Sequence, residues 1–577
     1  MPLARDTSSW WDWWTFHEEE FLLLALRTRV VRATDLASEC LRGDLGNAFD
    51  GVTDWQRVER AMPSLLSFTD AANPSALREA ALEALSRMPE DADGRILAAL
   101  LDGIAARDAR CVEAAALGLA RTAPSSGVLT ALWMLAVGAE QGRTLLQRDE
   151  VPPQMRGLAV QGLVAQAARS RDVELRRRVL QWLKHELDAA EASSPAVASA
   201  AITGIGLLCS EQVVLASQGA EWLLAARLRE MRADVRPHLL LALGRLGKVL
   251  VDDDLRKACS MALLEEAAGG AMGAQRAAVL ALGRMSRADD ALAPASRAEL
   301  LRLTHTSPDP ITRYCAVLSL AAIAIADPVA ERAAGTPIVR ALLEGMQAGH
   351  GEERAWHILA LGMLEHHSVL YAGGQVHLVQ AELLEAFLRT RSPEPAAACA
   401  LALGLFRDRG QSEQIRDRME RTASSALLRA GAPALGLLGD RSQIPYLRAL
   451  MADSAHEAET MRAAAIGLTM LGDFEVVPQL LRTLQECAGS SSLERSLRAC
   501  EVLGVVGDRR AVEPLIELLA APDTQPVVRV AAIRALGKVC SGAQPAWDSP
   551  RLDGAAFLPL TCPWFGDQHD VGQQVAP

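Results

Sequence analysis

Aromatic residues are scarce in this chain, and its cysteines form no recognisable motif. Aromatics make up 4% of the 577 residues, with only three tyrosines, although half of the residues are hydrophobic. The ten cysteines run from Cys40 to Cys562 without any CxxC pair, which argues against a zinc site or a thioredoxin-like redox motif. Because several of them, such as Cys209 and Cys315, fall in expected apolar helices, we interpret them as buried small hydrophobes in a reducing compartment.

Long hydrophobic runs are missing as well. The longest, near Cys315 to Ala326, is far short of the ~18 residues that a membrane-spanning helix needs. The N-terminal apolar run Phe21 to Leu26 follows three glutamates and lacks the basic region of a signal peptide. We therefore expect a cytoplasmic protein without a membrane span; a secreted or envelope-associated protein is the alternative if an upstream signal sequence precedes this chain.

Basic charge is in the minority, with a net charge of −12. Acidic chains repel phosphate backbones, so nucleic acid is not an expected partner. The sequence also has no GxxxxGK[ST], GxGxxG or GxSxG motif, so it gives no sign of a phosphate loop, a dinucleotide site or a nucleophile elbow. No small-molecule substrate is evident.

What the sequence does contain is an internal repeat, a helical stretch that ends in a pattern close to Ala-Leu-Gly-x-Leu-Gly-Asp. Eight clear copies and five weaker ones give thirteen starts, separated by 32 to 44 residues. This period fits two helices and two turns per unit. The clear copies read ALGRLGK at 242–248, ALGRMSR at 281–287, ALGMLEH at 360–366, ALGLFRD at 402–408, ALGLLGD at 434–440, GLTMLGD at 467–473, VLGVVGD at 502–508 and ALGKVCS at 535–541; the weaker ones start near 81, 116, 160, 204 and 319.

Proline marks the first half of four of these units. Pro337, Pro445, Pro478 and Pro514 lie 21 to 24 residues before the start of their blocks. Proline inside a helix removes a backbone donor and clashes with the preceding turn. We therefore expect a kink in the first helix of each of these units.

Arginine is the third marker, and it falls about six residues before the block. Examples are Arg236, Arg313 and Arg354. One interpretation is a ladder, in which the arginine that opens each second helix binds an acidic group or a carbonyl of the neighbouring repeat. The other interpretation is an arginine-lined groove for an acidic partner. The sequence leaves both open.

The packing that follows from these markers is a stack of helical hairpins. The Ala, Leu and Gly residues of the block recur at helical spacing and form one apolar stripe. Glycine inside a helix costs about 1 kcal/mol relative to alanine, so its recurrence indicates close helix contacts or a helix stop. The predicted fold class is all-α, an α-α superhelix of the ARM/HEAT-like solenoid type with about thirteen helical hairpins over residues 61–540.

Together these markers resemble the HEAT-repeat superfamily, and most closely the short HEAT-like repeats of bilin lyases. The likeness is sharpest from about 430 to 540, where the stretch 508–515 (DRRAVEPL) leads into 528–537 (VRVAAIRALG). The resemblance implies a superhelix with its second helices on the concave side, and it implies no particular chemistry. The segment 10–22 (WWDWWTFHEEEFL) is similar to a Trp-rich lead-in ahead of HEAT arrays in some planctomycete-type bacterial proteins, which suggests a bacterial source.

The two ends of the chain depart from the repeat. Residues 1–60 hold five of the eleven tryptophans, including Trp13 and Trp14. A solenoid needs its first apolar face covered, so we expect this segment to cap the first hairpin. A docking patch is the alternative, because tryptophan is enriched at binding hot spots. Residues 541–577 contain five prolines, and we expect an irregular C-terminal tail.

Histidines are concentrated between residues 350 and 377, but they do not predict a metal site. His350 precedes an expected helix, His357 lies within it and His366 lies at its end, so at 1.5 Å per residue the first and last are roughly 24 Å apart. Single ions cannot bridge that distance. The His-Glu pairs starting at His17, His185 and His456 also do not sit at equivalent repeat positions, unlike the iron-binding pairs of the HEAT-repeat enzyme deoxyhypusine hydroxylase. We therefore expect no metal ligand and no cofactor.

The sequence thus favours a non-catalytic scaffold or adaptor that binds protein partners on the concave surface of a solenoid. The alternatives are an enzyme or enzyme subunit of HEAT-repeat type, either metal-dependent or bilin-lyase-like, and a structural component of a cell-envelope assembly. The candidate partner-binding residues are Trp13, Trp14, Arg236, Arg313, Arg354 and His357.

Overall fold

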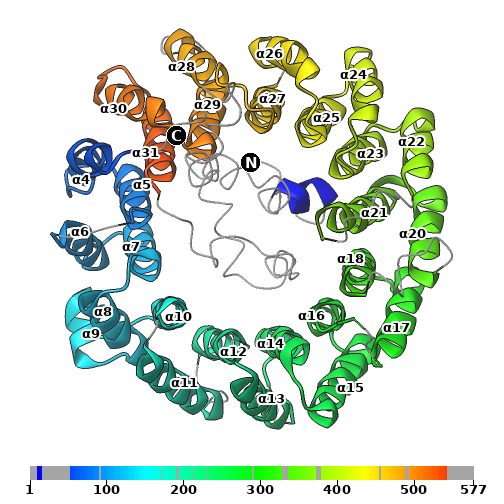
Figure 1. Ribbon diagram of the computed structural model, residues 1–577. Helices are drawn as coiled ribbons and strands as arrows, with labels where there is room; N and C mark the ends of the chain where they lie inside the picture. Colours follow the sequence, from blue (N-terminus) through cyan, green and yellow to red (C-terminus); the bar gives the residue numbers. More distant parts are fainter. Residues whose placement is uncertain are drawn as a thin grey trace, which may run out of the picture. The chain divides into compact units, whose positions relative to one another are not determined.

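The computed structural model describes residues 9–15, 52–89, 93–170, 172–189, 194–210, 212–228, 231–288, 291–327, 336–371, 379–453, 457–487 and 493–541. These residues form helices and turns, with no β-strand among them (Figure 1). The helices pair into thirteen successive hairpins in the described chain, as the repeat predicts. None of the helices in these ranges combines the length and apolar character that crossing a membrane would require.

The chain divides into two compact units, and each contains several hairpins. Unit 1 comprises residues 1–20, 163–408 and 550–577, and unit 2 comprises residues 21–162 and 409–549. In unit 1 the hairpins pair α11 (Val173–Asp188) with α12 (Pro195–Cys209), α13 (Val213–Arg227) with α14 (Arg236–Val249), α15 (Asp253–Gly269) with α16 (Met272–Arg284), α17 (Ala293–Thr306) with α18 (Pro310–Ala326), α20 (Pro337–Ala348) with α21 (Gly351–Tyr371), and α22 (Gln380–Arg389) with α23 (Pro393–Leu405).

Unit 2 contains hairpins from both ends of the array. Its N-terminal part holds η1 (Gln56–Ala61), α4 (Met62–Ser67), α5 (Ser75–Ser86), α6 (Arg95–Ile104), α7 (Ala109–Arg121), α8 (Ser126–Val137), α9 (Glu140–Leu146) and the first part of α10 (Pro153–Arg169), which crosses the unit boundary. Its C-terminal part holds η2 (Arg409–Gln411), α24 (Ser412–Glu420), α25 (Ser425–Leu438), η3 (Arg441–Gln443), α26 (Ile444–Ala452), α27 (Ala458–Met470), α28 (Val476–Cys487), α29 (Leu493–Val506), η4 (Arg509–Ala511), α30 (Val512–Ala520) and α31 (Pro526–Val539).

Second helices of neighbouring hairpins pack directly on one another, and the block glycine makes this possible. A β-carbon added to Gly244 in α14 would lie 2.6 Å from the β-carbon of Ala281 in α16. Two carbon atoms that are not bonded to each other cannot approach so closely. The same close approach joins Gly362 in α21 to Ala402 in α23. In Figure 1 the second helices of unit 1 lie on the concave side of that unit, as the family resemblance implies.

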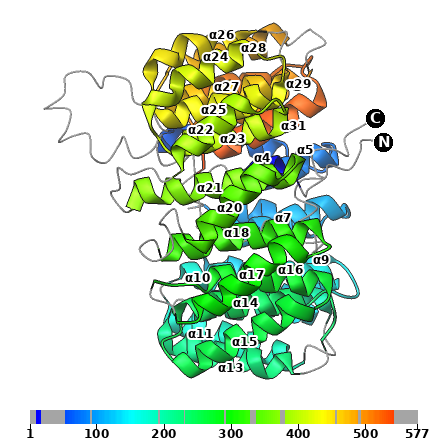
Figure 2. The ribbon, with the colours of Figure 1, turned by 90° about the vertical axis from the view of Figure 1, so that its right-hand side faces the viewer.

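The first hairpin of the chain packs on the last one, within unit 2. A β-carbon added to Gly537 in α31 would lie 2.5 Å from the β-carbon of Ala84 in α5. The helices α31 and α5 thus approach each other as closely as the second helices of hairpins that are consecutive in sequence. The hairpin of α4 and α5 therefore continues the stack after the hairpin of α30 and α31 (Figures 1 and 2). We call this contact between α31 and α5 the end junction. It also sets the start of the first block at Ala84, three residues after the position near 81 that the sequence suggests.

The end junction corrects the expected role of the tryptophan segment. The apolar face of the first hairpin is covered by α31, whereas the helix at residues 10–15 belongs to unit 1 and contacts α21 and α23. The tryptophans of residues 10–14 therefore do not cap the first hairpin, because that face already has a partner. Residues 16–51, and the expected irregular tail from 542 onward, lie outside the described residues.

The marker prolines start helices, and the expected kinks are absent from the helices that contain them. Pro337 is the first residue of α20, and Pro445 is the second residue of α26. Pro478 and Pro514 are each the third residue of their helices, α28 and α30. Backbone N–H groups in the first turn have no intrahelical partner, so a proline there costs no hydrogen bond.

Candidate partner-binding surface

The arginines that open the second helices form a ladder from repeat to repeat. Arg276 in α16 donates to both carboxylate oxygens of Asp309, at 2.8 and 2.9 Å, and Asp309 caps α18 of the next hairpin. Nε and Nη2 of Arg236 both donate hydrogen bonds to the carboxylate of Glu266 in α15. Arg462 pairs with Glu501 at 2.9 Å. The fork of Arg276 holds the Asp309 carboxylate bidentately, and all three pairs join neighbouring hairpins.

Arg313 takes part in the same ladder. Its Nη1 donates to the carbonyl of Ser307 at 2.9 Å, and its Nε lies 3.5 Å from Glu353 of α21. Arg236 and Arg313 are thus engaged in contacts between neighbouring helices, which is the structural role that the sequence left open.

The two candidate residues in α21 have different surroundings. His357 is 5% exposed, and its ring packs so closely on α20 that a β-carbon added to Gly345 would lie 2.1 Å from it. Its Nδ1–H donates to the carbonyl of Glu353, and burial lowers its pKa. His357 therefore lies in the core between α20 and α21, where a partner cannot reach it. The small residues of α21 lie on another side of that helix and face α23. Arg354, in the first turn of α21, is half-buried.

The tryptophans of residues 10–15 lie on the second-helix side of unit 1, beside α21 (Figure 1). Trp10 and Trp14 are fully buried, and Trp13 is 5% exposed. The ring of Trp13 meets Trp356 edge-on with centroids 5.8 Å apart. Trp356 in turn stacks on Tyr314 of α18 at 5.4 Å. Three elements that are distant in sequence thus build one aromatic cluster.

Two carboxylates complete this arrangement. Glu352 accepts a hydrogen bond from the backbone N–H of Trp10 at 3.1 Å, and Glu394 accepts one from the Trp10 indole N–H at 3.3 Å. Buried polar groups are costly without a partner, so these bonds are what allow Trp10 to be buried completely. We call Tyr314, Glu352, Trp356 and Glu394 the aromatic patch; it spans α18, α21 and α23.

Of the six candidate residues, the structure gathers five around this part of unit 1. Trp13 lies on the aromatic patch, Trp14 is buried in the same short helix, and Arg313, Arg354 and His357 lie on the helices of the patch. Arg236, in α14, lies elsewhere. The aromatic patch itself was not predicted from the sequence. The signal was present, because aromatic residues are rare in this chain and both Tyr314 and Trp356 occur in the first half of a second helix.

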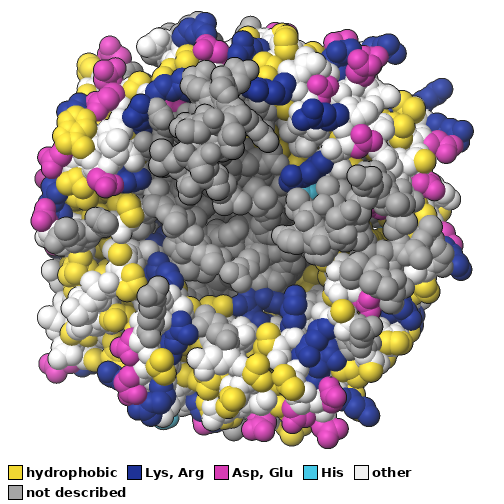
Figure 3. Space-filling model, viewed as in Figure 1, with side chains coloured by type: hydrophobic (Ala, Val, Ile, Leu, Met, Phe, Trp, Pro, Cys, Tyr) yellow, Lys and Arg dark blue, Asp and Glu magenta, His cyan; other side chains and the backbone are white. Residues whose placement is uncertain are grey.

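Basic side chains gather on the second helices α14 and α16. Arg245 and Arg284 occupy the same block position in neighbouring repeats, Lys248 follows one turn later in α14, and Arg287 lies just beyond the end of α16. Lys248 is exposed, and the other three are half-buried. Figure 3 shows lysine and arginine side chains along the inner edge of unit 1 over these helices. This basic surface contrasts with the net negative charge of the chain.

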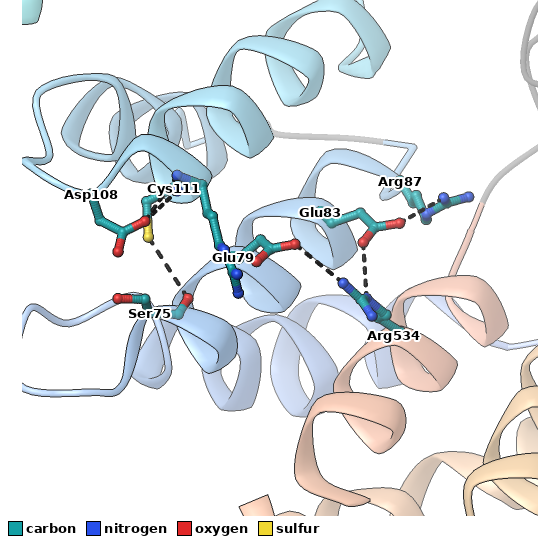
Figure 4. Close-up of polar contacts among 8 residues, drawn as sticks. Ser75, Glu79, Glu83, Arg87, Asp108, Cys111 and Arg534 are labelled. Atoms are coloured by element: carbon teal, nitrogen blue, oxygen red, sulfur yellow. Dashed lines mark hydrogen bonds and ion pairs between the residues drawn. The ribbon is translucent and has the colours of Figure 1, made fainter. Parts of the chain in front are cut away.

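The end junction carries a charge network of its own (Figure 4). Arg534 of α31 donates to Glu79 at 3.3 Å and to Glu83 at 3.1 Å, both on α5. Glu83 also accepts from Arg87 at 3.0 Å. Burial opposes ionisation of Glu83, but the charges of Arg87 and Arg534 outweigh it and lower its pKa to about 2. Glu83 is therefore an anion at neutral pH.

Groups of side chains suited to a metal ion are absent from the residues that the structure describes. His366 is buried, and its Nδ1–H donates to the carbonyl of Leu405 at 3.3 Å, while His357 faces α20. His17, His377 and His456 lie outside the described residues, as does the side chain of His367. His357 and His366 thus serve packing and hydrogen bonding.

Comparison with known proteins identifies the repeat. Residues 483–548 match a family model described as HEAT repeats. A comparison of the sequence with curated proteins found no match. Among solved structures, a crystal structure of Kap121p bound to Pho4p is similar, with TM-score 0.37, 13% identity, and coverage of 87% of this chain and 60% of Kap121p. The chain thus spans about three fifths of the length of Kap121p.

A crystal structure of importin beta is also similar, with TM-score 0.38, 13% identity, and coverage of 94% of this chain and 85% of importin beta. Such identities are too low to carry function from one protein to another. The matched segment ends just beyond α31, and the same helical pair with its close glycine contact recurs through both units. Residues 483–548 therefore match the HEAT-repeat family, and the other hairpins of the described chain repeat the same pair of helices.

Proposed function

We propose that this protein is a non-catalytic scaffold or adaptor that binds protein partners on the second helices of unit 1. The observation that carries the proposal is the seating of residues 9–15 on α21 and α23, since this surface already holds a short helix from a distant part of the chain. HEAT arrays offer such extended surfaces because each hairpin adds one more pair of helices to the same face.

The surface has two chemically different parts. The aromatic patch suits apolar and aromatic side chains, and the basic surface of α14 and α16 suits acidic ones. Of the candidate residues, Trp13 and Arg354 stay within this proposed site. For Arg236 and Arg313 we propose a structural role, because their ion pairs join neighbouring helices. A partner segment with acidic and aromatic residues fits both parts.

Two finer points belong to the same proposal. The repeats from about 430 to 540 are of the bilin-lyase-like type found in bacteria, which their spacing of 32 to 35 residues supports. The protein acts in a reducing compartment such as the cytoplasm, which its cysteines support: the seven described ones are all buried and form no disulfide.

Affinity capture from the native cell, followed by binding measurements with purified candidates, tests the function. We compare the wild-type chain with an Arg245→Glu, Arg284→Glu variant and with a matched control, Arg177→Glu, Arg302→Glu. The control positions lie on the first helices α11 and α17, where each arginine pairs with a glutamate one turn away.

A partner bound by the wild type and the control, and bound at least tenfold more weakly by the α14–α16 variant, supports the proposal. Partners that bind all three proteins equally would contradict the assignment to this surface. Turnover of a defined substrate by the purified chain would contradict the non-catalytic role.

A further inference from the structure

Tryptophan is concentrated at one place on the second-helix side of unit 1. Four of the eleven tryptophans lie within residues 10–14, and Trp356 is a fifth. Three of the four are buried, and the helix that holds them is only six residues long. Large buried aromatic anchors in a short segment are typical of a docking motif.

The array is complete beneath this helix. α18 packs on α21, and α21 packs on α23, where Gly362 contacts Ala402 directly. Residues 10–15 lie outside the repeat, and Trp10 contacts both α21 and α23. They therefore pack on a surface that the hairpins already form without them, as a bound peptide would.

The contacts define what the surface recognises. Trp10 and Trp13 are three residues apart, so they lie on one face of the helix. Trp10 supplies two N–H donors to Glu352 and Glu394, and Trp13 supplies a ring edge to Trp356. A ligand thus needs two tryptophans with the spacing Trp-x-x-Trp and a free backbone N–H at the first of them.

We propose that the aromatic patch is a docking site for short partner helices that carry a Trp-x-x-Trp motif, and that residues 9–15 compete for it in cis. The proposal rests on the proposed scaffold function and names one ligand of its surface. A motif on the same chain competes at an effective concentration of roughly millimolar. A peptide with a Kd of about 10 μM for the vacant patch is therefore weakened about 100-fold by the wild-type chain.

A fluorescently labelled peptide of residues 5–20 serves as the probe, and fluorescence anisotropy measures its binding to the full-length chain. In the Trp10→Ala, Trp13→Ala, Trp14→Ala variant the patch is vacant, and we expect the peptide to bind it. We expect binding to the wild type to be at least tenfold weaker. Adding Trp356→Ala, or Glu352→Ala with Glu394→Ala, to the vacant variant should abolish binding.

Controls separate docking from loss of folding. Trp55→Ala removes a tryptophan that is 62% exposed and should leave peptide binding as weak as in the wild type. Circular dichroism and thermal melting confirm that each variant is folded. A peptide with alanine at both motif positions should bind none of the chains.

Two results would overturn the proposal. One is a folded vacant variant that does not bind the peptide, or binds it no more tightly than the wild type does. The other is a wild-type dimer in light scattering that the triple substitution abolishes, because residues 9–15 would then act between copies and not in cis. Either result leaves the capture experiment on α14 and α16 unaffected, so failure of this inference is distinguishable from failure of the scaffold function.

Discussion

Arg407 shows how one residue departs from the rule of its repeat. In the blocks near 440, 473 and 508 the residue before the aspartate is a glycine with φ of 68–70°, in the left-handed region. Arg407 occupies this position in its own block with φ of 58°. Its Nε and one Nη are buried without a hydrogen-bond partner, and burial lowers its pKa. Left-handed backbone costs a residue with a β-carbon about 1–2 kcal/mol.

We predict that Arg407→Gly stabilises the protein by about 1 kcal/mol, since relief of strain exceeds the entropy cost of glycine. The urea midpoint of unfolding measures it. Gly472→Ala is the matched control. It adds a methyl group with nothing within 4 Å, so its expected cost of about 1 kcal/mol reflects strain alone. A lower midpoint for Arg407→Gly would show that the side chain contributes more than its backbone strain costs.

A second residue predicts the response to pH. His238 in α14 is 6% exposed and shares a 3.2 Å hydrogen bond with Thr203. Burial lowers its pKa to about 4, against about 6.5 in an unfolded chain. Between about pH 4 and 6.5, His238 therefore binds a proton in the unfolded state and stays neutral in the folded state. This contribution to stability is complete above pH 6.5 and is lost as the pH falls toward 4.

Thermal melting between pH 7.5 and 4 checks this expectation. The wild type should lose stability faster than His238→Gln over that window, whatever the offset between them at pH 7.5. Parallel curves would mean that His238 stays neutral in both states or is exposed in the folded one.

At the scale of helices, the glycine contact is the same inside the array and at the end junction. Gly244 faces Ala281 between sequence neighbours, and Gly537 faces Ala84 across the end junction. Added volume at such a contact forces the two helices apart, at a cost of about 1–3 kcal/mol.

We therefore predict that Gly244→Ala and Gly537→Ala each destabilise the protein by about 1–3 kcal/mol, as measured by chemical denaturation. Gly269→Ala, at the last position of α15, has open space around the added methyl group and should be neutral or slightly stabilising. If Gly537→Ala behaved like Gly269→Ala, α31 and α5 would not be packed in solution.

The charges at the end junction distinguish it from the contacts inside the array. The residue before each block is apolar in most repeats, as in Leu241, Leu280 and Leu318. Around the end junction it is Glu501, Arg534 and then Glu83, with alternating sign. Such a pattern favours the pairing of the last hairpin with the first over other pairings.

A double-mutant cycle on Arg534→Ala and Glu83→Ala should give a coupling energy of about 1 kcal/mol, because both side chains are less than a third exposed. The cycle on Arg177 and Glu174, which are 58% and 60% exposed, should give no more than about 0.5 kcal/mol. Equal couplings would indicate that the junction charges are solvated like surface pairs.

At the scale of the molecule, the end junction links the two ends of a long chain. Arg534 and Glu83 are separated by 451 residues in sequence, and both belong to unit 2. The packing of a helix against its neighbours on either side limits how often it opens locally. The stability of the first hairpin against opening therefore depends on its contact with the last hairpin.

We predict that Gly537→Val increases hydrogen exchange in α5 as well as in α31, while α16 and α18 of unit 1 keep their protection. Mass spectrometry of exchanged peptides measures each helix separately. Exchange confined to α31 would show that α5 is held by its own neighbours alone.

Much of this architecture could be predicted from the sequence. The block spacing predicted the thirteen hairpins, and the recurring glycine predicted both close contacts and helix stops, as at Gly244 and Gly439. The offset of the arginines left a ladder and a groove both open, and Arg276 and Asp309 make a contact of the ladder type. The prediction of proline kinks was wrong. The helices begin only a few residues before these prolines or at them, so prolines expected in the helix interior lie in the first turn.

The candidate site was harder to predict. His357 was selected for its neighbours in sequence, yet its ring turns toward α20. The tryptophans were recognised as unusual, but their place beside Trp356 was not, because helical periodicity does not specify which distant surface a separate segment contacts.

The sequence by itself therefore determined the hairpin and its number, since these follow from apolar spacing within about 40 residues, while the inner face followed from the family resemblance. Only the tertiary structure decided what the ends do: α31 covers α5, and Trp10 reaches Glu352 and Glu394. Repeats present nearly identical faces, so several pairings satisfy the same local pattern. The choice among them depends on particular long-range contacts, a glycine against an alanine and an indole N–H against a carboxylate.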